Sequence, residues 1–491
     1  RYRLSITLPE GLFTNFQIDD NLPGGLVYMD DGTARAVIFS NGEGIFSADV
    51  GTLPVPAIPG ACMMIGDETT AIPDPLPCAL DDFNVGINTS TAADTDTQAS
   101  FTTGLDPQFK LGTLTNVDGD ADRELIIIEF NALVDNSAGG NNDAGNNRDN
   151  TFQLNVNGAA YGAVSAAQRV RISEPSITNL TKVVNPTAAD AGNTVAYTVT
   201  FSNANNANST TAFDVNLTDI VPAKMTLDLL SLTTSYLPAA CSSLTANTSA
   251  GNNINLVFST VPVACQVTVT YQATLLNTVV PGEALINTAN ITYTSLPGTN
   301  GTSGNPTGTN TPGIPGADDG ERNGSGVPVQ NDYFDSSTAQ VNVTQTLPVK
   351  SIVSTTQAHT SEAGDGSAGS ERDLAIGEII RYRLTVTIPE GTIPDLQLRD
   401  TLPAGFTFLN DGDIRISFLA NNPMTTEADV TGADNDALPP TFILPVDRIA
   451  VAGQDVTFTV ASLGTAGDLI NNDSDADAEY VVIDFNVRVN N

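Results

Sequence analysis

The sequence contains two copies of one long segment, and this repeat constrains the fold more than any other feature. RYRLSITLPEGLFTNFQIDDNLPGGLVYMDDG at 1–32 matches RYRLTVTIPEGTIPDLQLRDTLPAGFTFLNDG at 381–412, an offset of 380 residues. NVDGDADRELIIIEFNALVDN at 116–136 matches NNDSDADAEYVVIDFNVRVNN at 471–491, an offset of 355 residues. Self-similarity at a fixed, long spacing indicates two copies of one structural unit separated by a different unit.

The two copies are unequal at their ends. The first lacks a counterpart of 346–380, and the second lacks a counterpart of 137–173. We expect the chain to start inside one domain and to end inside another of the same type, with a neighbouring repeat or a neighbouring subunit supplying the missing strands. Under this hypothesis Tyr2, Leu4 and Ile6 are buried in the assembly and exposed in the isolated chain.

Secondary structure is expected to be strand throughout. Apolar and β-branched residues alternate with polar ones in segments such as 195–201 and 382–388, and clusters of Gly, Pro and Asn separate these segments. The pattern predicts an all-β chain of tandem immunoglobulin-like β-sandwich domains. We predict three domains: 1–173 lacking its first strand, 174–345 with a Gly/Pro/Asn-rich loop at 296–330, and 346–491 lacking its last strand.

The middle unit carries the motifs of a known repeat family. They are a Thr-Lys pair at 181–182, GNTVAYTV at 192–199, TDIVPA at 218–223 and INTAN at 286–290. The unit resembles the DUF11 repeat domain. The flanking units, with GEIIRYRLTVTIPEG at 377–391 and RDTLPAG at 399–405, are similar to fimbrial isopeptide-forming domains. These resemblances imply immunoglobulin-like domains from large bacterial surface proteins.

The isopeptide resemblance implies a buried lysine in each unit. A lysine in a sandwich core is costly as a charge and has a lowered pKa, so its neutral amine can attack an asparagine amide beside a protonated acid. In the family order of lysine, acid and asparagine, the middle unit offers Lys182, Asp219 and Asn287. The last unit offers Lys350 with Asp400 or Glu378, and its asparagine stays open among Asn486, Asn491 and a strand equivalent to the one carrying Asn150. The alternative is a solvated strand lysine paired with a surface acid.

Calcium is the cofactor that the acidic motifs predict. Carboxylates at every second position of a tight loop can converge on one hard cation. This pattern occurs at Asp118, Asp120, Asp122 and Glu124, and again at Asp473, Asp475, Asp477 and Glu479. Glu129 and Asp484 fall at the closing spacing of an EF-hand loop, but both are expected in strands. A second candidate combines Asp318, Asp319 and Glu321 with Asn331 and Asp332. The alternative is a solvated acidic turn.

The four cysteines form two local pairs, Cys62 with Cys78 and Cys241 with Cys265. Close pairs in even number predict two disulfides and an oxidising compartment, and the alternative is four buried thiols. The single histidine, His359, cannot build a zinc site with them.

The remaining features bear on function. A net charge of −37 repels nucleic acid and anionic membranes, and no apolar run is long enough for a spanning helix. Nucleophile, metalloprotease and nucleotide-binding motifs are missing, so we expect no enzyme. The leading hypothesis is a calcium-stabilised structural subunit or repeat segment of an extracellular filament, fibre or surface layer that associates with itself. The alternative is the stalk of a cell-surface adhesin that binds an external ligand.

Overall fold

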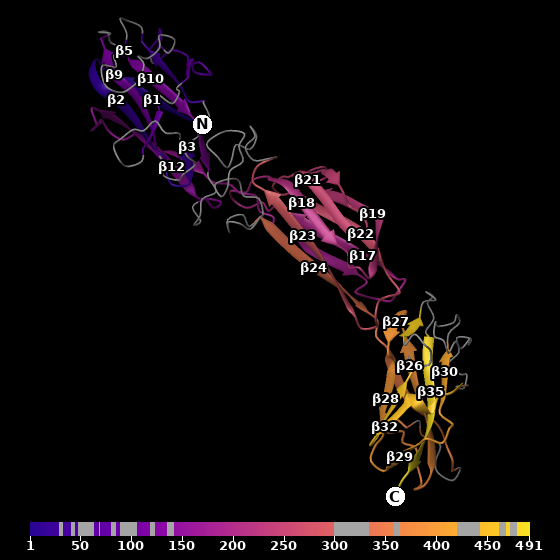
Figure 1. The fold of residues 1–491 in the computed structure, drawn as a ribbon. Helices are drawn as coiled ribbons and strands as arrows, with labels where there is room; N and C mark the ends of the chain where they lie inside the picture. The colour runs from indigo at the N-terminus through magenta and orange to yellow at the C-terminus, as the bar shows by residue number, and fades with distance from the viewer. Residues whose placement is uncertain are drawn as a thin grey trace.

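The fold is almost wholly β-strand and forms three successive sandwiches (Figure 1). The computed structural model describes residues 1–28, 33–40, 45–47, 63–67, 69–79, 85–88, 106–117, 123–134, 142–298, 333–357, 364, 366–419, 442–460, 468–471 and 479–491. Within these residues the 3-10 turn η2 (Val446–Arg448) is the only helical element. The predicted all-β class of tandem β-sandwich domains is confirmed.

The first sandwich is built from two main sheets. One has the order β1-β10-β4-β6, with β7 beside β4, and its strands are β1 (Tyr2–Leu8), β4 (Arg35–Phe39), β6 (Met63–Met64), β7 (Cys78–Ala79) and β10 (Glu124–Phe130). The other has the order β13-β12-β2-β9-β5, with β14 beside β12 and β8 beside β9. Its strands are β2 (Gly11–Asn21), β5 (Ile45–Ser47), β8 (Val85–Asn88), β9 (Asp106–Asn116), β12 (Asn147–Val156), β13 (Ala159–Tyr161) and β14 (Gln168–Arg171). A short pair joins β3 (Leu26–Tyr28) to β11 (Ala132–Val134).

The middle sandwich has a four-stranded and a six-stranded sheet. The four-stranded sheet has the order β15-β17-β22-β19, with β15 (Thr181–Asn185), β17 (Thr194–Ser202), β19 (Met225–Leu237) and β22 (Gln266–Leu275). The six-stranded sheet has the order β16-β24-β23-β18-β21-β20, with β16 (Ala188–Ala189), β18 (Ala212–Ile220), β20 (Leu244–Asn247), β21 (Asn253–Val261), β23 (Ala284–Thr294) and β24 (Phe334–Val343). Alternating residues of both sheets turn inward and form one continuous core.

The last sandwich combines one large sheet with two small ones. The large sheet has the order β25-β26-β35-β30-β31, with β29 beside β35, and its strands are β25 (Leu347–Thr355), β26 (Ile379–Ile388), β29 (Phe406–Leu409), β30 (Arg415–Leu419), β31 (Phe442–Ile443) and β35 (Glu479–Val489). The small sheets are β27 (Gly391–Pro394) with β34 (Asp468–Asn471), and β28 (Gln397–Thr401) with β33 (Asp455–Thr459) and β32 (Ile449–Ala452).

The sequence repeat is also a repeat of strand register. Leu4 of β1 lies opposite Ile128 of β10, and Leu384 of β26 lies opposite Ile483 of β35, which are the same pairs shifted by 380 and 355 residues. The two copies differ at their edges. In the first sandwich β12 pairs with β2, and β1 ends its sheet, whereas in the last sandwich β25 covers β26.

The expected exposure of the N-terminal strand is wrong. Leu4 and Ile6 are each only 3% exposed, and Tyr2 is half-buried. These side chains lie on the face of β1 that packs against the second sheet of their own sandwich, so the sandwich buries them without an added strand. The edge that β1 leaves open consists of backbone groups rather than of core side chains.

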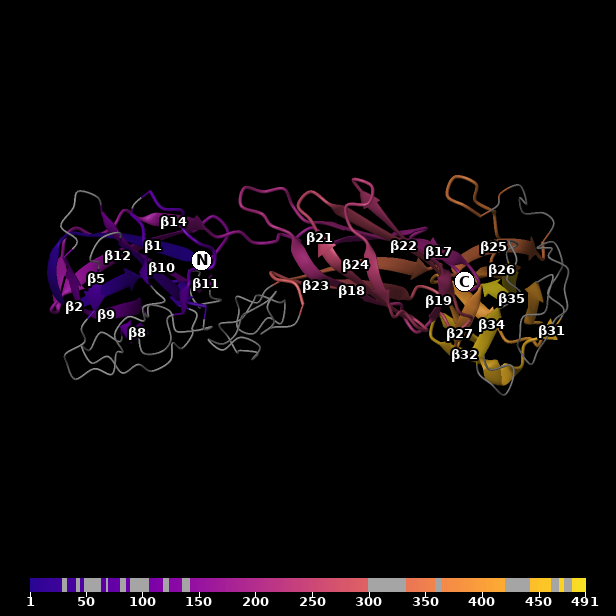
Figure 2. The same ribbon diagram turned by 90° about the horizontal axis from the view of Figure 1, so that it is seen from above.

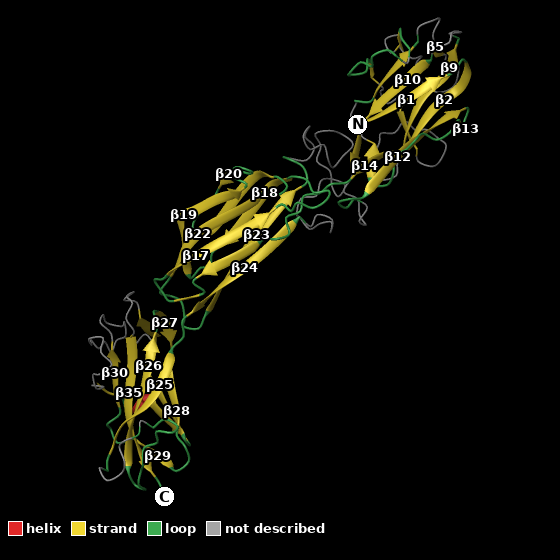
Figure 3. Ribbon diagram, turned by 180° about the vertical axis from the view of Figure 1, so that it is seen from behind, coloured by secondary structure: helices red, strands yellow, loops and turns green. Residues whose placement is uncertain are grey.

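The sandwiches follow one another end to end, as the views in Figures 2 and 3 also show. Residues 391 and 392 at the start of β27 meet the loop after β22 of the middle sandwich. There the Thr392 amide donates to the Val279 carbonyl at 2.9 Å, and the Thr392 hydroxyl donates to the Asn277 carbonyl at 2.8 Å. The middle and last sandwiches are therefore joined by hydrogen bonds in addition to the chain connection.

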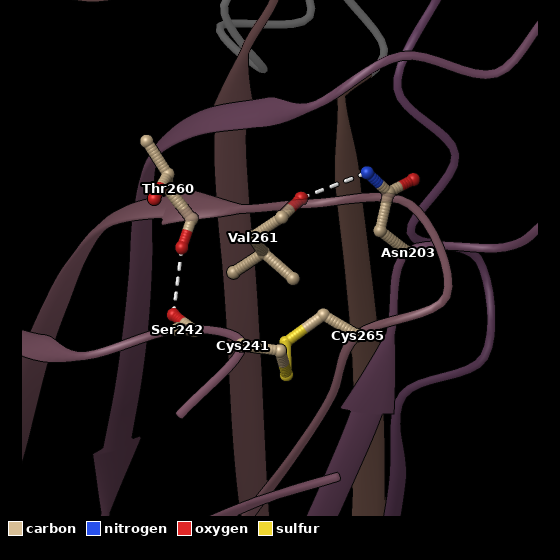
Figure 4. Close-up of a disulfide and its surroundings, with 6 residues drawn as sticks. All are labelled: Asn203, Cys241, Ser242, Thr260, Val261 and Cys265. Atoms are coloured by element: carbon tan, nitrogen blue, oxygen red, sulfur yellow. Dashed lines mark hydrogen bonds between the residues drawn. A yellow bond between two sulfur atoms is a disulfide. The ribbon is translucent and has the colours of Figure 1, made fainter. Parts of the chain in front are cut away.

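A disulfide between Cys241 and Cys265 lies where the middle sandwich crosses between its sheets (Figure 4). Its Cα atoms are 5.7 Å apart. Next to it, Ser242 donates to the Thr260 carbonyl at 2.6 Å, and Asn203 donates to the Val261 carbonyl at 2.8 Å. Cys78 is also disulfide-bonded, and its expected partner, Cys62, lies outside the described residues.

Removing the Cys241–Cys265 bond should destabilise the middle sandwich. It links residues 24 positions apart, and losing a cross-link of this size costs about 2–4 kcal/mol of unfolding free energy. We expect C241S/C265S to lower the calorimetric transition of the middle sandwich, whereas C62S/C78S should leave that transition unchanged. Equal effects of the two double variants would contradict the assignment.

Candidate functional site

An ion pair between Lys182 and Asp219 crosses the core of the middle sandwich. Lys182 lies on β15 of the four-stranded sheet, and Asp219 lies on β18 of the six-stranded sheet. The lysine Nζ is 2.7 Å from the Asp219 Oδ2, and the two side chains are 0% and 1% exposed. The alternation of β15 turns Lys182 inward while Val183 points to solvent, so the lysine replaces an apolar core residue.

Two tyrosines and Asn287 complete this cluster. The Tyr271 hydroxyl donates to Asp219 Oδ2 at 2.5 Å, and the Asn287 amide donates to the Tyr271 oxygen at 2.8 Å. The lysine Nζ lies 5.2 Å from the Tyr197 ring centroid and 5.8 Å from that of Tyr271, and the two rings stack on each other. The structure therefore brings together all three residues that the family order selects, Lys182, Asp219 and Asn287.

The sequence analysis did not select the two tyrosines. Tyr197 on β17 and Tyr271 on β22 are direct cross-strand partners, at inward positions of strands that otherwise carry apolar residues there. A polar ring at an inward position of each of two strands is the signal that could have identified them.

Burial drives this cluster toward its uncharged forms. It lowers the pKa of Lys182 to about 8 and raises the pKa of Asp219, although the attraction between the two opposes both shifts. Burial also raises the pKa of Tyr197 to about 12. Two acceptors in the cluster, Asp219 Oδ1 and Asn287 Oδ1, have no hydrogen-bond partner among the described residues. A proton on Asp219 would turn one of these acceptors into a donor.

The last sandwich has the lysine and the acid of this arrangement. Lys350 on β25 contacts both oxygens of Asp400 on β28, at 2.7 and 2.8 Å, and its Nζ lies 4.1 Å from the Tyr382 ring centroid. Its side chain is 34% exposed, because a groove of about 320 Å³ runs past Lys350, Leu384 and Leu398. The acid is thus Asp400.

The other acid and the asparagines considered for Lys350 lie elsewhere. Glu378 accepts hydrogen bonds from the amides of Ala375 and Gln357, at 2.7 and 3.3 Å. Asn486 lies on the opposite face of β35 from the core residue Phe485, where it donates to Asp411 at 2.8 Å. Asn491 is exposed. The structure brings none of these three to Lys350.

The first sandwich has the acid and the asparagine. Asp20 on β2 is the counterpart of Asp400, and Asn150 on β12 donates to its Oδ2 at 3.1 Å. Asp20 is 0% exposed and Asn150 is 4% exposed. Burial, aided by repulsion from Asp106, raises the pKa of Asp20 to about 7. Burial also raises the pKa of Asp19, the neighbour of Asp20, and the positive charge of Lys110 opposes that shift.

The candidate calcium loops are described only at their ends. Asp118, Asp120, Asp122, Asp473, Asp475 and Asp477, and the whole second candidate at Asp318, Asp319 and Glu321, lie outside the described residues. The described closing residues are buried: Glu124 accepts from Asn116 at 2.8 Å, and Glu479 accepts from Asn471 at 3.0 Å. Among the described residues no group of three or more acidic, His or Cys side chains is placed to hold a metal.

The two acids at the EF-hand closing spacing are paired with arginines. Glu129 contacts Arg1, with an oxygen–nitrogen distance of 3.0 Å, and also Arg3. Asp484, its counterpart, contacts Arg383 at 2.9 Å and Arg381 at 3.5 Å. The repeated RYR motif therefore neutralises a repeated acid on the neighbouring strand, a contact that the sequence analysis missed.

Comparisons with known proteins give fold-level likeness only. No family model matches, and no curated protein matches. One similar structure is the T6 backbone pilin of serotype M6 Streptococcus pyogenes, at 14% identity over 96% of this chain and 95% of the pilin, with a TM-score of 0.28. A C-terminal fragment of the major pilin GBS80 of Streptococcus agalactiae matches at 12% identity over 46% of this chain and 90% of the fragment, with a TM-score of 0.21.

A third similar structure is the collagen-binding domain of a Staphylococcus aureus adhesin, at 15% identity over 23% of this chain and 84% of that domain, with a TM-score of 0.17. At these TM-scores the likenesses carry no argument about function. The described part of the chain also has no helix that is long and apolar enough to cross a membrane.

Asp20 should make the first sandwich less stable as the pH rises. Because its folded pKa is about 7 against an ordinary 3.8, its contribution to stability is complete below about pH 4 and is lost as the pH rises through 7. We expect D20N, which cannot titrate, to stabilise this sandwich at pH 8 by up to about 4 kcal/mol and to change little at pH 4.

The difference in stability between D20N and the wild type can be measured by urea unfolding, with hydrogen exchange of residues 2–21 as the readout. The control is D149N, since Asp149 is exposed and paired with Arg169, which lowers the pKa of its carboxyl. A pH dependence that persists unchanged in D20N would contradict the assignment to Asp20.

Proposed function

We propose that this chain is a structural segment of an extracellular surface fibre, or of a related surface layer, in which tandem sandwiches resist mechanical extension. The observation that carries the proposal is the fully buried Lys182–Asp219 pair with Asn287 beside it, which connects the two sheets of the middle sandwich. A buried ion pair is weak support for stability alone, because desolvation offsets the attraction between the charges. Its position suits a reaction that removes both charges.

That reaction is the formation of an isopeptide bond between Lys182 and Asn287. The neutral amine attacks the Asn287 amide carbon, the new bond joins this carbon to Nζ, and the bond to Nδ2 breaks. The protonated Asp219 polarises the amide and passes the amine proton to the departing nitrogen, which leaves as ammonia. The cluster is suited to this step because burial favours the neutral amine and the protonated acid. The reaction is internal, so no external substrate is turned over.

Such a bond would suit a protein under tension. Lys182 lies on β15 at the start of the middle sandwich, and Asn287 lies on β23, which only β24 follows in this sandwich. A covalent link between them would transmit force across the domain without loading the hydrogen bonds of residues 183–286. The ion pair in its present form already fixes the same two sheets.

Two further features belong to the proposal. Calcium bound at the acidic loops would reduce the repulsion within a chain of net charge −37 and would stiffen the structure. Strand completion between repeats or subunits would join copies of the chain, which makes the chain its own main partner. The second candidate function, an adhesin stalk that binds an external ligand, uses the same sandwiches without polymerisation.

The bond predicts a specific mass. After reduction of the disulfides, the intact protein should be lighter than its sequence by one ammonia for each bond, and K182M should restore the mass expected for an unlinked middle sandwich. The control is K224M, because Lys224 forms a partly exposed pair with Glu283 at 2.7 Å and should not affect the bond. Tandem mass spectrometry should locate the link between Lys182 and Asn287. A wild-type mass equal to that of the sequence would disprove the bond.

If calcium binds as proposed, it should affect both the stability and the assembly of the protein. At a hundredfold excess over Kd, calcium should stabilise the protein by about 2.7 kcal/mol, and EDTA should reverse the effect. D118N/D120N/D122N should remove the part due to the first loop. Negative-stain images with and without chelator then separate the two functions, since regular fibres support the structural segment and isolated rods support the adhesin stalk. A melting temperature unaffected by calcium would exclude the calcium role.

A further inference from the structure

Strand β19 forms an open edge of the middle sandwich. It pairs with β22 on one side, and no described strand lies on its other side (Figures 1 and 3). The strand is 13 residues long, and Asp228 is its only charged residue. Folded proteins usually protect an edge strand with charges or prolines, because its free backbone groups can pair with another chain. Beyond Asp228, β19 carries neither.

A bulge in β19 turns two leucines outward. The strand advances five residues, from Asp228 to Thr233, while its partner β22 advances only two. The extra residues include Leu229 and Leu230, which are 39% and 97% exposed. A bulge is a defined local structure that re-aims side chains at the edge of a sheet.

Hydrogen bonds hold this bulge in place. The Leu230 amide donates to the Asp228 carboxylate at 3.0 Å, and the Ser231 hydroxyl donates to the Asp228 carbonyl at 2.6 Å. The Gln272 amide of β22 donates to the Ser231 oxygen at 2.8 Å, so a side chain serves β22 where the ladder is interrupted. Leu230 is therefore a fixed apolar projection, and little conformational freedom is left to lose when a partner covers it.

The other end of β19 is apolar and exposed. Leu237 is 66% exposed, and residues 238–240, which are Pro-Ala-Ala, are exposed as well. In an antiparallel pair of two β19 strands, each end of one strand meets the opposite end of the other. With Ser235 on the twofold axis, position 233 would face position 237, and the projecting Leu230 of one copy would reach residues 238–240 of the other.

Charge also favours a second copy at this edge. The whole chain has a net charge of −37, so two copies repel each other at long range. The middle sandwich differs, because residues 174–298 contain six acidic and two basic residues, a net charge of −4. Two of these eight, Lys182 and Asp219, are buried together in its core. At β19 two copies can therefore approach with hardly any charge between them.

We propose that the β19 edge is a self-association surface, at which the β19 strands of two copies of the chain pair antiparallel and each Leu230 packs on residues 237–240 of the other copy. A twofold interface uses the same patch on both partners, so the projection and the apolar end of one strand complement each other once the strand is duplicated. The inference rests on the proposed function, because it names the surface by which neighbouring chains associate side by side. Backbone hydrogen bonds along residues 233–237 and the covered leucines supply the affinity.

Sedimentation of the full chain tests the surface. We expect a monomer–dimer equilibrium that shifts toward the dimer as salt is added, because salt screens the repulsion between the acidic chains while the interface itself holds no ion pair. L230D should weaken dimerisation about tenfold or more, because it replaces the apolar anchor by a charge. It should leave the melting temperature unchanged, since the Leu230 side chain is almost fully exposed.

The matched control is I220D, which makes the same change of charge at a residue that is 69% exposed on β18 of the other sheet, and it should dimerise like the wild type. A cysteine on the axis locates the contact. S235C should form a disulfide between two chains under mild oxidation, because residues opposite each other on antiparallel strands bring their Cβ atoms together, whereas I220C should not.

Three outcomes would overturn the proposal. They are a chain that stays monomeric up to the highest protein and salt concentrations reached, an L230D variant that dimerises like the wild type, and equal cross-linking of S235C and I220C. The mass of the Lys182–Asn287 link is measured on the single chain and does not depend on β19, so failure here is distinguishable from failure of the proposed function.

Discussion

A lysine amine held between two sheets by an aspartate is the interaction on which the rest of this structure depends. Neither group could enter an apolar core alone, because an isolated buried charge costs more than packing returns. Placed on opposite sheets, Lys182 and Asp219 satisfy each other only when the two sheets are correctly aligned. The pair therefore fixes the alignment of the sandwich as well as occupying its core.

The same arrangement occurs in different states of completion along the chain. The middle sandwich encloses the amine, the acid and the amide, the last sandwich holds the amine and the acid, and the first holds the acid and the amide. The lysine is buried where all three groups are present and more exposed where the amide is missing. The side chain of Lys182 is 0% exposed, and that of Lys350 is 34% exposed. The cluster of the last sandwich is thus open to solvent, and Asp20 Oδ1 and Asn150 Oδ1 of the first sandwich have no hydrogen-bond partner among the described residues.

The excess of acidic residues gives the positions of the arginines their importance. The chain has 19 basic residues against 56 acidic ones, too few to give each carboxylate a basic partner of its own. Glu129 on β10 and Asp484 on β35 do have basic partners, because the repeated RYR motif lies across from them on the neighbouring strand. Exposed ion pairs contribute little, but these acids are buried, and a charge in that position needs its counterion.

Strand periodicity, the 380-residue repeat and the order of lysine, acid and asparagine could all be read without a structure. The first two depend on local alternation and on direct comparison of residues, so the all-β class followed from the sequence, whereas the set Lys182, Asp219 and Asn287 was what the family resemblance implied. The stacked Tyr197 and Tyr271, the choice of Asp400 over Glu378 and the burial of Leu4 did not. These depend on which faces of distant strands meet, and only the packing of the two sheets decides that. The pairing of β1 with β10, more than a hundred residues away, likewise becomes visible only when the sheet order is known, because a strand's neighbours are set by tertiary contacts rather than by its own residues.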